Sequence, residues 1–338
     1  MKLFRNDYSE ICHENVLKAL SDSLNEQNIG YGLDSHSENA ERIIKDRFGL
    51  TDSSVYFLVG GTQTNLTFIA HSLKSYEAVI GVKSAHINVH ETGSIEATGH
   101  KILLVDGVNG KLNGCDVLNI LKNHTDEHMV KPKLVYISNS TEVGSIYTKN
   151  ELKELYKVCK DNGLYLFIDG ARLACALTAS TNDLDPKEFA SLCDAFYIGG
   201  TKNGLLFGEA LVINNKDLQK EFRFAIKQRG ALLAKGFISG IQFEAIFKDD
   251  LYFEIAKNAN SCAKYLEELL NKLNLDVEKI YTNQLFVTLS NDLADFIVSK
   301  FGCEVWEKYE TKQKIRFVTS FMTKKEDVLE VYNTIKKY

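Results

Sequence analysis

Apolar stretches alternate with amphipathic ones along most of the chain. Six short stretches are rich in β-branched and aromatic residues and apolar nearly throughout: SVYFLV (54–59), EAVIGV (77–82), KLVYISN (133–139), GLYLFID (163–169), DAFYIGG (194–200) and EALVIN (209–214). Strands buried on both faces have this pattern, as in a mostly parallel sheet covered by helices. Between two of them, residues 148–163 have apolar side chains at helical spacing, which predicts a β-α-β crossover. We therefore expect an α/β fold.

The N-terminal region has a helical pattern of its own. Residues 14–28 (ENVLKALSDSLNEQN) carry apolar side chains at the spacing of one helix face. In the next helical stretch, Ser35 lies three residues before Glu38, as in a capping box, and Gly49 follows as an end signal. Two helices are expected before the first strand.

The last hundred residues change character. A long helical run (241–274) leads into three strand-like stretches and a final helix. This order favours helices packed on a small antiparallel sheet. We expect two domains: residues 1–240 form the N-terminal segment and the large domain, and residues 241–338 form a small α+β domain.

Composition and charge narrow the function classes. The net charge of −5, without a block of basic residues, favours neither nucleic acid nor a membrane surface as a partner. The first residues lack the apolar core of a signal peptide, and no stretch approaches the ~20 apolar residues that span a bilayer. Seven cysteines without a C-x-x-C pair indicate reduced thiols. We expect a cytoplasmic protein.

Histidine spacing gives little support for a metal site. His86/His90 and His124/His128 are each four residues apart, but neither pair forms H-E-x-x-H and each lacks further ligands. No metal is expected.

Candidate chemistry lies where the predicted strands end, because ligands of open α/β sheets bind at the carboxyl ends of the strands. After the first strand, GGTQTN (60–65) opens a helix, where the amides of Gly61, Thr62 and Gln63 could bind an anion. The sequence fits neither G-x-x-x-x-G-K-[ST] nor G-x-G-x-x-G. Taken alone, such a turn is more often only a turn.

Three further groups follow later strands. His86 could stack on a planar ligand or be a structural histidine. Asp169 ends a buried strand, where it could meet a cationic ligand, cap the next turn or pair with Arg172. Lys202 lies between glycines in GGTKNG, either as a surface lysine or as a shielded nucleophile. An anion site, an acid and a lysine together match pyridoxal phosphate, which needs its phosphate bound, its ring nitrogen protonated and an amine to hold it.

The order of these motifs resembles one family. FRNDYSEICHE, YGLD, GGTQTN, AHINVHETG, STEVGSIY, FIDGARL, GGTKNG and IRFVTS follow one another over essentially the whole chain as in the low-specificity L-threonine aldolases. Those enzymes belong to the β-eliminating-lyase branch of the fold type I pyridoxal-phosphate enzymes. The resemblance implies an aspartate-aminotransferase-like large domain with a mostly parallel sheet, and pyridoxal 5'-phosphate as cofactor.

The resemblance also implies roles for individual residues. Lys202 would form the Schiff base, Asp169 would pair with the pyridinium and His86 would stack on the ring. The phosphate would be held by Gly61 and Thr62, with Gln63 beside them. The substrate carboxylate would be held by Arg172 and Arg316, with Asn6 nearby, since a guanidinium fork suits a carboxylate. A partner subunit would add three side chains, the two lysines helping to neutralise the phosphate: Tyr31, Lys227 and Lys235.

The reaction implied is retro-aldol cleavage of L-threonine or L-allo-threonine to glycine and acetaldehyde. Glu142 stands where many relatives carry a histidine, which leaves open the group that contacts the substrate hydroxyl. The base could be His86, a water held by Glu142 or His90, or the cofactor phosphate. Alternatives are β-elimination, transamination or decarboxylation, or a pyridoxal-phosphate-binding regulator without activity. The family suggests a homotetramer built from dimers, with sites between subunits.

Overall fold

The larger part of the chain is built on a seven-stranded sheet. A computed structural model describes residues 3–338, and the first two residues of the expected 1–240 domain lie outside it. The sheet has the strand order β1-β7-β6-β5-β4-β2-β3. Its strands are β1 (Ser54–Leu58), β2 (Glu77–Val82), β3 (Ile102–Val105), β4 (Lys131–Ser138), β5 (Tyr165–Asp169), β6 (Ala195–Gly199) and β7 (Glu209–Ile213).

Strand direction brings the expected motifs to one edge of this sheet. The pairs among β2 to β6 are parallel, whereas β7 is antiparallel to both β6 and β1. β1 therefore runs in the same direction as β6, so that GGTQTN follows β1 at the edge where Asp169 ends β5. Because β7 runs the opposite way, its first residue, Glu209, lies at that edge opposite Gly199. The predicted α/β class with a mostly parallel sheet is confirmed.

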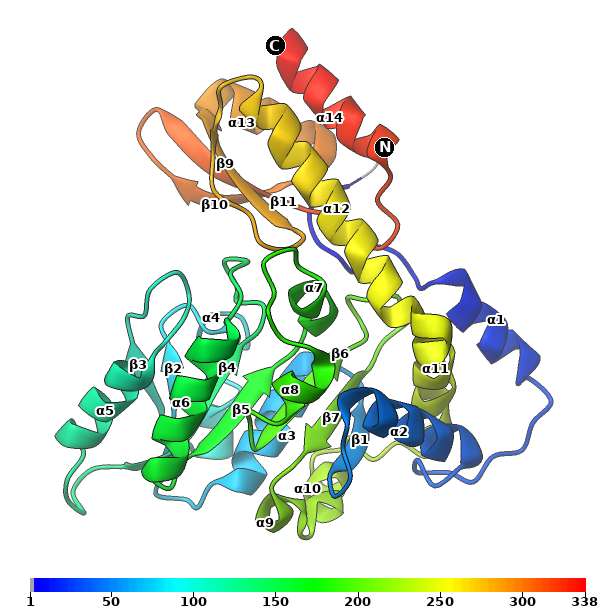
Figure 1. Cartoon of the computed structure of the whole chain (residues 1–338), viewed down its shortest axis with the longest axis vertical. Coiled ribbons are helices and arrows are strands. Elements are labelled where there is room, and N and C mark those ends of the chain that lie inside the picture. The colour runs from blue at the N-terminus through cyan, green and yellow to red at the C-terminus, as the bar shows by residue number, and fades with distance from the viewer. Residues whose placement is uncertain (1–2) are drawn as a thin grey trace.

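Helices accompany the sheet, and Figure 1 shows their arrangement. Those of the first 250 residues are α1 (Glu14–Asp22), α2 (Ser35–Phe48), α3 (Gly61–Ser72), α4 (His86–Val89), α5 (Gly114–Asn123), α6 (Lys149–Asp161), α7 (Leu173–Leu177), α8 (Pro186–Ala190), α9 (Lys216–Gln219), α10 (Phe222–Gln228) and α11 (Phe237–Phe247), with short 3-10 helices at Glu96–Thr98 and Lys248–Asp250. The crossover predicted over 148–163 is α6, whose first turn is fixed by a capping box between Thr148 and Glu151.

The cap of α2 differs from the expectation. Asp34, not Ser35, is the N-cap: its carboxylate accepts hydrogen bonds from the Ser37 N–H at 2.9 Å and the Ser37 hydroxyl at 2.8 Å. An aspartate satisfies a free helical N–H as well as a serine does, so two adjacent capping residues gave an ambiguous signal. Gly49 ends the helix in the left-handed conformation, as predicted.

The C-terminal part forms a second sheet with its own core. Strands β8 (Asp276–Val277), β9 (Gln284–Ser290), β10 (Glu304–Lys308) and β11 (Lys312–Val318) are antiparallel in the order β10-β11-β9-β8. They are accompanied by α12 (Leu251–Asn271), α13 (Asn291–Phe301) and α14 (Lys325–Lys337). In Figure 1 this unit stands above the large sheet, with α12 running from one to the other.

The long helical run expected over 241–274 is broken. Asp249 and Asp250 have positive φ angles of 53° and 59°, and they separate α11 from α12. Residues of α11 and the first turns of α12 belong to the core of the large sheet, and later residues of α12 belong to the core of the small one. The expected boundary at residue 240 falls inside α11, and the division into domains stays a prediction.

The first described residues form an N-terminal strap (residues 3–13) that joins the two sheets. Phe4 is fully buried in the small core. Its N–H donates to the Phe301 carbonyl at 2.9 Å, and the Phe4 carbonyl accepts from the Val318 N–H at 2.8 Å. At the other end of the strap, the His13 N–H donates to the Gly204 carbonyl at 2.8 Å. The strap thereby fixes the residues between 4 and 13 against both parts of the chain.

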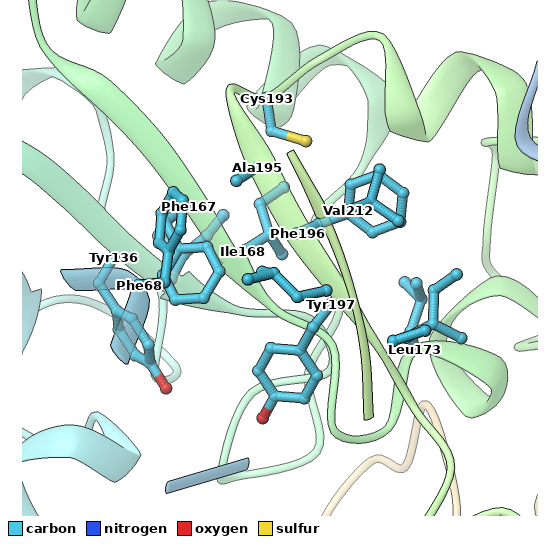
Figure 2. Packing of buried hydrophobic residues seen from close by; sticks show 14 of the residues in the cluster. Phe68, Tyr136, Phe167, Ile168, Leu173, Cys193, Ala195, Phe196, Tyr197 and Val212 are labelled. Atoms are coloured by element: carbon cyan, nitrogen blue, oxygen red, sulfur yellow. The ribbon is translucent and has the colours of Figure 1, made fainter. Parts of the chain in front are cut away.

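Aromatic side chains fill the core beneath the site. Figure 2 shows Phe68 packed on Phe167, with Tyr136 and Tyr197 beside them and the two hydroxyl groups at the same end of the cluster. Because these phenol rings are buried, each hydroxyl needs a polar partner. Within residues 3–338, no helix has the length and apolar character of a membrane span, and no group of three or more acidic, histidine or cysteine side chains is placed to hold a metal.

Candidate active site

A polar cavity of about 320 Å³ opens at the edge of the large sheet where the parallel strands end. It brings together residues from the strap, from the parts of the chain around both sheets and from the glycine-rich turn. Its lining comprises Arg5, Asn6, Tyr8, His86, His90, Glu142, Arg172, Lys202, Glu304 and Arg316. Among the residues predicted from the sequence, Asn6, His86, Glu142, Arg172, Lys202 and Arg316 therefore share one cavity.

Lys202 projects from the turn between β6 and β7. The turn is held by the N–H groups of Gly200 and Thr201, which donate to the Gly208 carbonyl at 3.0 and 3.1 Å. A Cβ atom on Gly200 would lie 2.6 Å from that carbonyl, so only glycine fits there. Burial, and then the positive charge of Arg172, lower the pKa of Lys202 below its usual value. A lowered pKa increases the fraction of neutral amine, which is the nucleophilic form.

Asp169 is a buried carboxylate with several hydrogen-bond donors. Its Oδ1 accepts from the Tyr197 hydroxyl at 2.5 Å and the Ala171 N–H at 3.0 Å, and its Oδ2 accepts from the Tyr136 hydroxyl at 2.5 Å. Burial alone would raise the pKa of Asp169, but the charge of His86 and these hydrogen bonds lower it. Asp169 therefore also caps the turn that follows β5, through the Ala171 N–H. Arg172, which the sequence offered as a partner of Asp169, forms its ion pair with Asp7 instead.

His86 begins α4 and contacts two acids. Its backbone N–H donates to Glu142 Oε1 at 2.9 Å, and its ring Nδ1 lies 2.7 Å from Glu91 Oε1. The Ser138 hydroxyl also donates to Glu142 Oε1, at 2.7 Å. Burial raises the pKa of Glu142, which favours its neutral acid form. Burial, and then the charge of His86, lower the pKa of His90, which favours the neutral imidazole.

The first turn of α3 has the features of an anion site. Its N-cap, Gly60, provides no side-chain hydrogen bond, and within residues 3–338 no hydrogen bond reaches the N–H groups of Gly61, Thr62 or Gln63. A Cβ on Gly61 would lie 2.9 Å from the Tyr197 hydroxyl, the group that donates to Asp169. The Gln63 side chain accepts from the Val59 N–H at 3.3 Å, which fixes the turn after β1.

The two arginines already have carboxylate partners. Arg172 forms a bidentate ion pair with Asp7 of the strap, Nε to Oδ2 at 2.7 Å and Nη2 to Oδ1 at 3.0 Å. Arg316 contacts Glu304 through Nη2 and donates from Nη1 to Gln284 at 3.0 Å. Among the described residues, Nε of Arg316 is buried without a partner, so one donor stays free.

Seven predicted residues do not line this cavity: Gly61, Thr62, Gln63 and Asp169, described above, and Tyr31, Lys227 and Lys235. Tyr31 and Lys227 lie against each other, with the Lys227 Nζ 5.0 Å from the centre of the Tyr31 ring. Tyr31 lines a different pocket, together with Arg223, and Lys235 is exposed in the turn before α11. Their role at a partner subunit's site stays a prediction.

Sequence reasoning did not assign several residues of this region: Asp7, Asn65, Glu91, Tyr136, Tyr197, Glu209 and Glu304. From the sequence, Tyr136 and Tyr197 are typical core residues, and only the fold shows that both hydroxyls bind Asp169. Asp7 lies in FRNDYSEICHE, but the sequence gives no sign of its partner, Arg172. Glu209, polar at the start of an apolar strand, was the one detectable signal; burial raises its pKa to about 8.

Comparisons with known proteins agree on one group. The Beta-eliminating lyase family profile matches residues 12–292. The low specificity L-threonine aldolase of Pseudomonas aeruginosa is 35% identical over 270 residues, covering 78% of this chain and 77% of that protein. Its counterpart from a Pseudomonas species is 33% identical over 271 residues, with the same coverage.

Solved structures extend the comparison to the whole chain. A threonine aldolase from Leishmania major superposes with a TM-score of 0.98 at 43% identity, covering 100% of this chain and 99% of that one. An aspartate aminotransferase from Thermus thermophilus has a TM-score of 0.71 at 12% identity, over 99% and 91% of the two chains. This second likeness concerns the fold alone, and it confirms the aspartate-aminotransferase-like architecture expected from the sequence.

Proposed function

The chain belongs to the Beta-eliminating lyase family, and from that premise we propose that it is a pyridoxal-phosphate-dependent threonine aldolase. It cleaves the Cα–Cβ bond of L-threonine or L-allo-threonine to give glycine and acetaldehyde. The observation that carries this conclusion is one cavity lined by Lys202, Arg172 and Arg316, with the buried carboxylate of Asp169 close enough to Lys202 for their charges to interact. The identity of 35% to 43% with threonine aldolases selects the reaction among those the fold supports.

The residues present fit pyridoxal phosphate. The first turn of α3 offers free N–H groups for the phosphate at a helix N-terminus, and Gly61 has no room for a side chain. Asp169 is buried, and its pKa is lowered, so it presents a negative charge suited to a protonated ring nitrogen. When bound, pyridoxal phosphate supplies the electron sink that accepts the electron pair of the breaking bond. His86, at the cavity wall, is placed to stack on a flat ring.

Lys202 would hold the cofactor through its amine. Its lowered pKa provides the neutral nucleophile at lower pH than an exposed lysine would. Arg172, the strongest nearby cause after burial, contributes by repelling a second positive charge. The Arg172 guanidinium would therefore have two roles: it lowers the pKa of Lys202 and binds the substrate carboxylate.

The substrate carboxylate would be bound by Arg172 and Arg316, with Asn6 nearby. Asp7 orients Arg172 through two hydrogen bonds, and Arg316 keeps Nε free. A carboxylate held by both arginines would fix the orientation of the bound amino acid, and that orientation would decide which bond of Cα breaks.

A base must accept the proton of the substrate β-hydroxyl. Three protein groups border the cavity at this point: His86, His90 and Glu142. The lowered pKa of His90 favours its neutral, proton-accepting form, and the raised pKa of Glu142 shifts that group toward its neutral acid form. We propose that a histidine or a water bound to it accepts the proton and that Glu142 orients the hydroxyl; the cofactor phosphate is the alternative base.

A partner subunit would complete the site. We propose a homotetramer made of two dimers, in which Tyr31, Lys227 and Lys235 reach the site of the neighbouring chain. Five apolar side chains between residues 11 and 33 are more than half exposed, as is Phe224 near Lys227: Ile11, Leu17, Leu24, Ile29 and Leu33. Exposed apolar side chains of this kind are expected at contacts between subunits. Sedimentation of the protein and of Leu24→Asp, together with cofactor affinity, tests this assembly.

We also propose a cytoplasmic location, on the sequence evidence of seven cysteines without a C-x-x-C pair.

The deciding experiment measures acetaldehyde and glycine released from L-threonine and from L-allo-threonine by the cofactor-loaded protein. Release from both substrates is expected, and Lys202→Ala should abolish it. A protein that binds the cofactor but releases neither product would overturn the aldolase assignment. Assays for ammonia and keto acid would then separate β-elimination from transamination.

A further inference from the structure

Glu91 is a buried acid next to the site that has no assigned role. It follows α4, and its side chain is fully shielded from solvent. Oε1 lies 2.7 Å from Nδ1 of His86, and Oε2 accepts from the Ser94 hydroxyl at 2.6 Å. A carboxylate is expensive to bury unless cationic or hydrogen-bonding groups compensate it.

Asn65 connects this acid to the ring-nitrogen partner of the proposed cofactor. Its Nδ2 donates to Glu91 Oε1 at 2.8 Å and to Asp169 Oδ2 at 3.2 Å. Both hydrogens of one amide group are therefore used to bridge two buried carboxylates. Within the described part of the chain, Oδ1 of Asn65 has no hydrogen-bond partner. The orientation of the Asn65 amide is therefore set by its two donated hydrogen bonds.

We propose that Glu91 and Asn65 are positioning residues: Glu91 fixes the imidazole of His86 through Nδ1, and Asn65 fixes the carboxylate of Asp169. This inference rests on the function proposed above. A carboxylate only accepts hydrogen bonds, so the proton between Glu91 and His86 resides on Nδ1. In the neutral ring, Nε2 is then the unprotonated nitrogen, available as an acceptor. The two groups on which the cofactor ring would rest are set by one network.

Helix α3 gives this network a second function. Asn65 lies on the helix whose first turn carries Gly61, Thr62 and Gln63. The anion site and the bond to Asp169 thus belong to one rigid element. The helix fixes the separation between the proposed phosphate site and the carboxylate that would meet the ring nitrogen.

A substitution that removes the charge of Glu91 but keeps its shape distinguishes this positioning role from a purely structural one. A glutamine at position 91 keeps an oxygen that can accept from Asn65, but its amide can also turn a donor toward His86. A rotation of Asn65 that turned Oδ1 toward that donor would also withdraw its hydrogen bond from Asp169, so the variant perturbs both contacts of the network. Glu91→Gln therefore preserves packing while it releases the imidazole from one fixed tautomer.

The first experiment uses the protein without cofactor, labelled with ring-¹⁵N histidine. The His86 signals, assigned with His86→Asn, should show the proton on Nδ1 in the unsubstituted protein, and Glu91→Gln should shift the ring toward the other tautomer. Glu96→Gln, an exposed acid on the same segment, is the matched control and should leave the signals unchanged. A proton on Nε2 in the unsubstituted protein, or no change in Glu91→Gln, would overturn the proposal.

The second experiment uses the cofactor-loaded protein. Glu91→Gln should alter the circular dichroism of the bound cofactor and reduce kcat/KM for threonine by about 10- to 100-fold, the loss of one charge-assisted hydrogen bond. Asn65→Asp, which places a third acceptor between two carboxylates, should weaken cofactor binding further. If threonine is not cleaved by the unsubstituted protein, yet Glu91→Gln changes the tautomer and the dichroism, the aldolase assignment fails and the positioning role stands.

Discussion

At the scale of single residues, the two arginines of the cavity differ in how firmly their partners hold them. The Asp7 side chain is 2% exposed and binds Arg172 at two points, whereas the Glu304 side chain is 43% exposed and sits on an edge strand. A buried bidentate pair is costly to break, but an exposed pair contributes little. An incoming substrate carboxylate would therefore exchange with Glu304 rather than with Asp7.

Glu304→Gln tests this difference. Removal of the competing charge should lower KM for threonine by up to about fivefold, since an exposed ion pair contributes ~0.2–1 kcal/mol. The measurement is the steady-state KM at low and high salt, with a smaller difference expected at high salt. Glu307→Gln, which neutralises an acid on the same strand outside the cavity, is the control. A raised KM would instead make Glu304 a residue that orients Arg316.

Glu209 gives a pH dependence with a defined sign. Burial raises its pKa from 4.5 to about 8, with Lys202 and Asp169 as its charged neighbours. Between these values the folded chain keeps a proton that the unfolded chain releases, so this group makes the free energy of unfolding fall as pH rises from about 4.5 to 8. Glu209→Gln should flatten that decline, as measured by urea unfolding of the cofactor-free protein across this range.

The matching control is Glu254→Gln, an exposed acid of α12. It should leave the profile unchanged. A decline in Glu209→Gln as steep as in the unsubstituted protein would assign the pH dependence to other groups.

Residues that act through charge at a strand end could be found from the sequence, and those defined by a distant partner could not. Lys202 and Asp169 stood out because a charged group after an apolar strand needs an explanation. Glu91 lies in AHINVHETG, but its proposed role depends on contacts with His86 and Asn65 that form only in the folded chain. Which pairs form is decided by the sheet order, and no spacing along the chain encodes it.

At the scale of elements, α3 is the helix on which the site depends most. Gly61 is its first residue, and an added Cβ would meet the Tyr197 hydroxyl at 2.9 Å. Gly60, its neighbour, has an extended φ of −176° and open space where a Cβ would be. The chain therefore offers two adjacent glycines with different requirements.

Gly61→Ala should weaken cofactor binding strongly, because the methyl group displaces the donor of Asp169 and crowds the anion site. Gly60→Ala is the control and should retain affinity close to that of the unsubstituted protein. Equilibrium titration of the cofactor-free protein with pyridoxal phosphate measures both. Equal losses in the two variants would show that the turn, and not the contact with Tyr197, limits binding.

Elements buried on both faces were the most predictable, and those set by local backbone choices the least. The six predicted strands correspond to β1, β2, β4, β5, β6 and β7, because continuous apolar runs have few other uses. The break before α12 was missed, since left-handed Asp249 and Asp250 continue a helical pattern of side chains. The short strands β3 and β8 were also missed: β8 has two residues and carries no periodicity.

At the scale of the whole molecule, the N-terminal strap joins the parts that form the cavity. Phe4 packs edge-on against Phe301 and Phe317 in the small core, and Asp7 binds Arg172 beside the large sheet. Asn6 and Tyr8 on the strap line the cavity itself. The cavity lining and the packing of the small core are thereby linked through one segment.

Phe4→Ala should reduce the free energy of unfolding by about 3–5 kcal/mol, the usual result of emptying a buried aromatic site. It should also raise KM for threonine, because Asn6 and Asp7 lose their anchor. Urea unfolding and steady-state kinetics measure the two effects. Leu3→Ala, at a neighbouring position that is 43% exposed, is the control. A destabilised protein with an unchanged KM would separate the strap's packing from the site.

The contacts of the strap also set the order in which the cavity can form during synthesis. Lys202, Asp169 and the first turn of α3 are synthesised with the large sheet. Phe4 can form its hydrogen bonds only after Phe301 and Val318 have been synthesised. Arg316 emerges at the same late stage. During synthesis, the groups proposed to bind the cofactor can therefore assemble before the two arginines proposed to bind the amino acid are both in place.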